Sequence, residues 1–145
     1  MIKLIPINSA EVSALFKQIP LPYFESISAG FPSPADDYLE GNLSLDQLLI
    51  KHPSATFFVR VEGSSMIDVG IYPDDILIVD KSLYAKPNAI IVAIIEGEFT
   101  VKRFVKYQNR YFLKAENKSF KAIEVTNNDQ FQIWGVVTYV LHKPS

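Results

Sequence analysis

The sequence predicts a mainly β protein: a compact, partly closed β body preceded by a flexible N-terminal arm with one or two short helices. From Ala55 onward, short runs rich in Val, Ile, Phe and Tyr follow one another between turn residues. No long helical pattern interrupts these runs. A chain of 145 residues is also long enough to bury one core of its own. Together these observations favour one compact β fold.

The N-terminal arm is predicted to contain a short helix over residues 8–19. Asn8 suits the N-cap position, and apolar residues recur at helical spacing from Val12 to Ile19. Pro20 and Pro22 would end this helix. A helix of this length is unstable alone in water, so we expect it to pack on the protein's own body.

The next segment, residues 26–37, is rich in Ser, Gly and Pro and shows little periodicity. Residues that precede proline favour extended backbone, so we expect an exposed, extended linker, the kind of segment that proteases cut. Ser44 and Gln47 form a capping-box pattern that opens a second short helix, which Pro53 would end. We therefore divide the chain into an N-terminal arm and cleavable linker, residues 1–44, and a β domain, residues 45–145.

The β domain is predicted to contain a succession of short strands. Gly97 separates two of them and predicts a tight hairpin. The expected strands cover residues 55–61, 75–80, 89–96, 98–106, 110–115, 120–125 and 131–141.

Composition excludes several classes of site. The chain has no cysteine, so disulfides, thiolate metal sites and cysteine nucleophiles are ruled out. Its two histidines stand in no metal-binding or triad pattern, and no Gly-rich phosphate loop is present, so we expect no cofactor and no metal. A net charge of −2 and a pI near 5.6 argue against direct specific DNA binding.

The chain shows no targeting or membrane segment. Its first residues are too short and too interrupted for a signal peptide, and no apolar run approaches the ~20 residues that a membrane span needs. We therefore expect a cytoplasmic protein with no membrane partner.

Serine and lysine are the residues left to carry catalysis. Gly63, Ser64 and Ser65 directly follow an apolar strand, where a sharp turn could present one hydroxyl and leave backbone N–H groups free as an oxyanion hole. Lys102 lies among apolar neighbours that would lower its pKa and let it act as a base. Lys102 and Arg103 must face opposite sides of their strand. An ordinary turn and a solvent-facing lysine remain the alternative on spacing alone.

Several ordered motifs resemble the UmuD branch of the LexA-type self-cleaving serine peptidases. The nucleophile motif of that family has its serine directly before Met, which corresponds to Ser65. Asp74 replaces a glycine that is usual in the family, and Asp tolerates positive φ better than most residues. The matching segments are Ala29-Gly-Phe-Pro-Ser-Pro-Ala35, His52-Pro-Ser-Ala-Thr-Phe-Phe-Val-Arg60, Gly63-Ser-Ser-Met-Ile-Asp68, Asp75-Ile-Leu-Ile-Val-Asp80 and Gly97-Glu-Phe-Thr-Val-Lys-Arg103.

The resemblance implies a latent peptidase that cuts its own bond between Ala29 and Gly30. Ser65 would be the nucleophile, Lys102 the general base, and the backbone N–H groups of Ser64 and Ser65 the oxyanion hole. The 29 residues before the cut are too few for the helical DNA-binding domain of LexA-type repressors.

The same resemblance implies a place in the SOS response to DNA damage. It implies a homodimer that is activated by a RecA filament on single-stranded DNA, and a cut form that assists a UmuC-like, error-prone DNA polymerase subunit in translesion synthesis. A non-catalytic dimeric binding module, and a phage- or plasmid-encoded relative with a different partner, remain alternatives.

Overall fold

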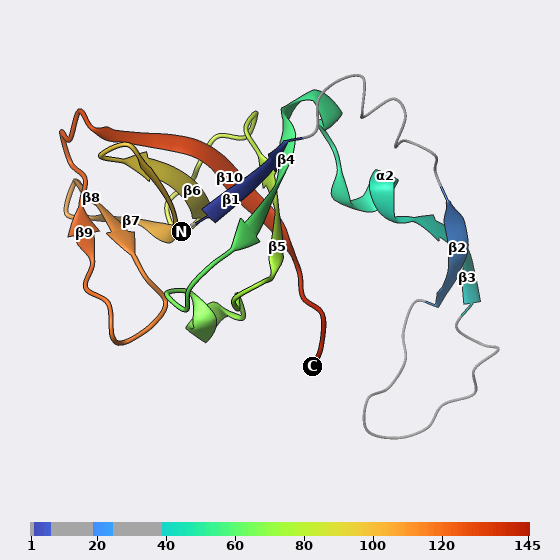
Figure 1. Cartoon of the computed structure of the whole chain (residues 1–145). Coiled ribbons are helices and arrows are strands. Elements are labelled where there is room, and N and C mark those ends of the chain that lie inside the picture. Colours follow the sequence, from blue (N-terminus) through green and yellow to red (C-terminus); the bar gives the residue numbers. More distant parts are fainter. Residues whose placement is uncertain (1, 7–18, 25–38) are drawn as a thin grey trace.

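One large antiparallel sheet dominates the computed structural model, which describes residues 2–6, 19–24 and 39–145 (Figure 1). Its eight strands lie in the order β1-β4-β5-β10-β6-β7-β8-β9. The strands are β1 Ile2–Pro6, β4 Thr56–Val61, β5 Ile76–Asp80, β6 Ile90–Ile95, β7 Glu98–Tyr107, β8 Arg110–Lys114, β9 Ile123–Glu124 and β10 Phe131–Leu141. The outermost strands, β1 and β9, do not pair with each other, so strand pairing leaves the sheet open. The mainly β prediction is confirmed.

A second, two-stranded sheet stands apart from the large one in Figure 1. Strand β2, Pro20–Phe24, pairs antiparallel with β3, Leu39–Ser44, and helix α2, Leu45–Leu49, follows directly. Helix α2 begins where the capping-box pattern predicts, with Ser44 at the N-cap. The Ser44 side chain makes no cap hydrogen bond, however, so that part of the prediction is wrong. Two 3-10 turns, Pro53–Ala55 and Ile67–Val69, complete the helical elements that the structure describes.

The arm prediction falls largely outside the described residues. Of the helix expected over residues 8–19, only Ile19 is described. The whole of the predicted linker, residues 26–37, lies outside the described residues. Strand β1, which comes from the segment assigned to the arm, pairs with β4 along its whole length.

Both faces of the central strand β6 are buried. Val92 belongs to one apolar cluster with Val59, Leu77 and Val101, whereas the adjacent Ile91 belongs to a second cluster on the other face. The second cluster also contains Ala85, Ala93, Phe104, Leu113 and Val125. Burial on both faces explains why the sequence of β6 is continuously apolar instead of alternating.

Two turns confirm expectations drawn from single residues. Glu96 and Gly97 link β6 to β7 with φ of 50° and 80°, the positive pair that a tight hairpin turn requires. Asp74, before β5, has a φ of 71°, so aspartate does occupy the left-handed conformation at this position. The Asp74 N–H donates to the Val61 carbonyl at 2.8 Å, which ties this turn to the end of β4.

None of the described helices is both long and apolar enough to cross a membrane.

Candidate active site

The turn after β4 presents Ser65 at the surface of the body. Gly63 has a φ of 87°, a conformation that favours glycine, and it turns the chain sharply away from the strand. Met66, directly after Ser65, is 2% exposed and packs in the core. A glycine on one side and a buried anchor on the other therefore hold the half-buried Ser65 at a defined place.

Strand β7 supplies the lysine. Lys102 pairs with Ile91 of β6 in the sheet and extends its side chain to the turn after β4. Its Nζ donates a hydrogen bond to Ser65 Oγ at 3.0 Å, although the two residues are 37 positions apart in the sequence. The fold thus brings together the serine and the lysine that the sequence singled out.

A pocket of about 200 Å³ opens over this pair. Besides Ser65 and Lys102, its lining combines apolar side chains with the polar residues Glu62, Ser64 and Thr100. The apolar part includes the half-exposed Phe120, whose ring centroid lies 5.8 Å from Lys102 Nζ. The other apolar lining residues are Val61, Met66, Phe99 and Val101. Burial against these groups lowers the pKa of Lys102 below the ordinary 10.5, because the charged ammonium loses hydration.

The backbone around Ser65 offers N–H groups that could bind an oxyanion. The N–H groups of Ser64 and Ser65 donate to no acceptor within the described part of the chain. The carbonyl of Ser64, in contrast, is held twice: by the Asn117 side-chain amide at 2.7 Å and by the Ile67 N–H at 3.3 Å. This turn therefore has fixed carbonyls and N–H groups free to receive a charged oxygen.

Arg103 faces away from the pair, as strand alternation predicts. Its Nε donates to Glu116 at 2.6 Å and its Nη1 donates to the Asn88 carbonyl at 2.6 Å. Glu116 and Asn117 lie in the loop between β8 and β9, which reaches the turn after β4. Neither residue carries a local signal in the sequence, because only the folded sheet brings that loop to Ser64.

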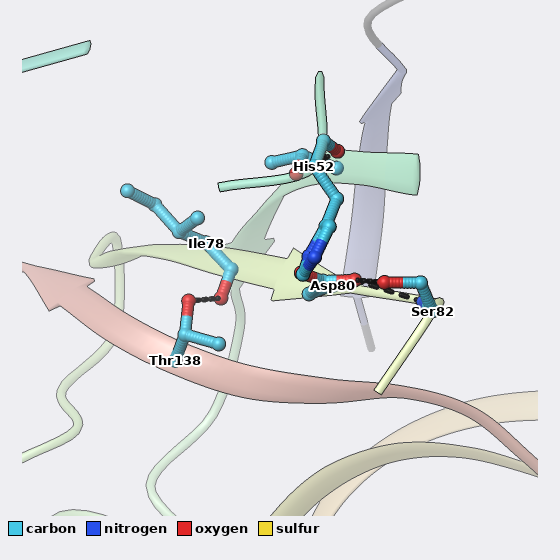
Figure 2. Close-up of polar contacts among 6 residues, drawn as sticks. His52, Ile78, Asp80, Ser82 and Thr138 are labelled. Carbon is cyan, nitrogen blue, oxygen red and sulfur yellow. Dashed lines mark hydrogen bonds and ion pairs between the residues drawn. The ribbon is translucent and has the colours of Figure 1, made fainter. Parts of the chain in front are cut away.

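The histidines make structural contacts elsewhere. Figure 2 shows His52 and Ser82 on either side of Asp80, at the end of β5. His52 Nδ1 lies 2.6 Å from Asp80 Oδ2, and the Ser82 hydroxyl donates to the other oxygen at 2.6 Å. Serine and histidine thus each bond the aspartate, which is not the serine–histidine contact of a hydrolytic triad. His142 lies 2.6 Å from the buried Asp75 in the same manner.

The two residues of the expected cut, Ala29 and Gly30, lie outside the described residues. Within residues 2–6, 19–24 and 39–145, no group of three or more potential ligands is arranged to hold a metal ion.

Comparison with known proteins finds one family and several close relatives. A family model described as Peptidase S24-like matches residues 22–138. The protein MucA of Salmonella typhimurium is 48% identical over 120 residues, which cover 82% of each chain. The protein SamA of the same organism is 41% identical over 121 residues, covering 83% of this chain and 84% of its own. The LexA repressor of Photorhabdus laumondii is 41% identical over 130 residues, covering 90% of this chain and 64% of the repressor.

Proposed function

The chain belongs to the S24-like peptidase family, and on that premise we propose that it is a latent serine peptidase that cuts its own Ala29–Gly30 bond. The observation that carries the proposal is the 3.0 Å contact between Lys102 Nζ and Ser65 Oγ. A serine hydroxyl is a weak nucleophile unless a base removes its proton. Lys102 supplies that base, because burial favours its neutral amine.

In the first half of the reaction, the neutral Lys102 amine takes the proton of the Ser65 hydroxyl while Oγ bonds to the carbonyl carbon of Ala29. The backbone N–H groups of Ser65 and Ser64 stabilise the negative charge that develops on the carbonyl oxygen. When the tetrahedral species collapses, the carbon–nitrogen bond breaks. The nitrogen of Gly30 accepts that proton from the Lys102 ammonium and leaves as an amine.

In the second half, Lys102 takes a proton from a water molecule that attacks the ester on Ser65. Collapse of this second tetrahedral species breaks the ester bond, returns a proton to Ser65 Oγ and leaves a free carboxyl group at Ala29. Residues 30–145 then form the processed protein. In this proposal the linker enters either the pocket of its own chain or that of a second copy.

The cellular role rests on the family resemblance. By this resemblance, the protein is a homodimer of the SOS response. A RecA filament on single-stranded DNA activates its cleavage, and the processed form serves an error-prone DNA polymerase subunit. The similarity to MucA and SamA over more than four fifths of the chain supports this branch of the family.

Mass spectrometry of the purified chain tests the proposal. Incubation at alkaline pH is expected to give two fragments, the larger starting at Gly30, and the Gly30→Asp variant is expected to stay intact. A fragment that starts elsewhere would move the cut to another bond. No cleavage at any pH, with or without a RecA filament, would contradict the peptidase proposal and favour a non-catalytic binding module.

A further inference from the structure

The loop between β8 and β9 contacts the turn that carries Ser65. The Asn117 side chain donates from Nδ2 to the Ser64 carbonyl at 2.7 Å. Its other amide atom, Oδ1, accepts the Ser119 N–H at 3.0 Å. The Ser119 N–H can only donate, so it requires Oδ1 on its side and leaves Nδ2 facing Ser64. The direction of the amide is therefore set by its own loop.

The contact to Ser64 has a consequence for the next residue. The Ser64 carbonyl and the Ser65 N–H belong to the same peptide unit, which is planar and trans. In such a unit the C=O and N–H bonds point in opposite directions. A group that holds the Ser64 carbonyl on one side therefore aims the Ser65 N–H toward the other side. The Ile67 N–H also reaches this carbonyl, but at the longer distance of 3.3 Å.

The loop is anchored strongly enough to serve as such a holder. The Glu116 carbonyl accepts the Asp68 N–H at 2.8 Å, and the Glu116 N–H lies 3.3 Å from Met66 Sδ. The Glu116 carboxylate in turn pairs with Arg103 of β7 at 2.6 Å. These contacts fix the loop to residues after Ser65, while Asn117 fixes it to the residue before. The turn is therefore held on both sides of the nucleophile.

We propose that Asn117 is a positioning residue that aims the Ser65 N–H at the carbonyl oxygen of the bond being cut. The inference rests on the proposed self-cleavage and assigns it a residue outside the serine–lysine pair. Removing an oxyanion-hole donor outright costs about 10²–10³ in rate. Loss of Asn117 leaves the donor in place but free to turn, so we expect a smaller, roughly 10- to 100-fold loss.

Two substitutions separate aiming from simple loop stability. Asn117→Ala removes both amide contacts, whereas Asn117→Asp keeps an acceptor for the Ser119 N–H and puts a charged oxygen in place of the donor to Ser64. Both variants are expected to cleave 10- to 100-fold more slowly. Asn128 offers a matched control, because its Oδ1 accepts the Gln130 N–H at 2.8 Å in the same type of turn. Asn128→Ala and Asn128→Asp are expected to cleave at the unaltered rate.

The pH profile distinguishes this role from an effect on Lys102. For Asn117→Ala we expect the cleavage rate to fall by the same factor at every pH, so the pH midpoint of the rate profile stays unchanged. A separate measurement of the thermal unfolding midpoint identifies any variant that fails to fold. Normal cleavage by Asn117→Asp, unchanged rates in both variants, or a shifted midpoint with an unchanged plateau would each overturn the proposal. If Ser65→Ala cleaved normally, the proposed function itself would fail. Normal Asn117 variants beside an inactive Ser65→Ala would refute only the inference.

Discussion

Replacing Lys102 with arginine tests whether the reaction needs a neutral side chain at this position. An arginine keeps the positive charge and can still donate to Ser65 Oγ, so it conserves the contact but not the base. The pKa of a guanidinium group lies about two units or more above the ordinary 10.5 of lysine. Burial lowers the pKa of Lys102 further, which widens the gap.

The size of the effect follows from that gap. Each unit of pKa above the working pH lowers the neutral fraction about tenfold, so Lys102→Arg should cut the rate at least ~100-fold between pH 7 and 10. The cleavage rate of the unaltered protein should rise about tenfold for each pH unit. It should level off at a pH below 10.5, because burial lowers the pKa of Lys102 in the folded protein.

The assay is the first-order rate of fragment formation on gels from pH 6 to 10. Lys106→Arg is the matched control, since Lys106 lies on the same strand, exposed to solvent. It should cleave normally. A Lys102→Arg rate within threefold of the unaltered protein, or a rate that does not change with pH, would refute lysine as the base.

Two further predictions concern stability and use urea unfolding. Burial raises the pKa of Asp80, but hydrogen bonds from Ser82 and His52 outweigh it and hold the pKa below its ordinary 3.8. The stabilisation from ionised Asp80 is therefore present at neutral pH and is lost as the pH falls below about 4. Asp80→Ala should lower the free energy of unfolding by about 2–3 kcal/mol at pH 7 and by less at pH 3. An equal loss at both pH values would contradict this account. A Cβ on Gly135 would lie 2.5 Å from Val79 Cγ1, so Gly135→Ala should cost about 1–3 kcal/mol, and an unchanged midpoint would show that the core can relax there.

The body of the sheet was predictable because each of its strands carries its own signal. Apolar and β-branched runs between turn residues located β4 to β8 and β10 to within a residue or two, and Gly97 located a hairpin. Strand β9 is shorter than predicted, since only Ile123–Glu124 pairs with β8.

The N-terminal strands carry a weaker signal. Pro20 and Pro22 argue against a strand, yet β2 contains both. Because β2 belongs to a two-stranded sheet, one of its edges makes no ladder, and proline is tolerated there. Local propensity could not show that β2 has a single partner strand.

The same distinction between local and distant contacts applies to the candidate site. Ser65 and Lys102 could be named because each lies in a recognisable local motif. Asn117 could not, since its contact to Ser64 spans 53 positions and depends on how the β8–β9 loop folds back. Neither a turn pattern nor hydrophobic periodicity records such a contact.

The most direct test of the central claim is a comparison of Ser65→Ala with Ser64→Ala. The two substitutions remove the same hydroxyl from adjacent residues, and only Ser65 Oγ lies within hydrogen-bond distance of Lys102 Nζ. Intact mass should show no fragment for Ser65→Ala and a fragment starting at Gly30 for Ser64→Ala. Cleavage that survives Ser65→Ala, or that is lost only in Ser64→Ala, would contradict the assignment of Ser65 as the nucleophile.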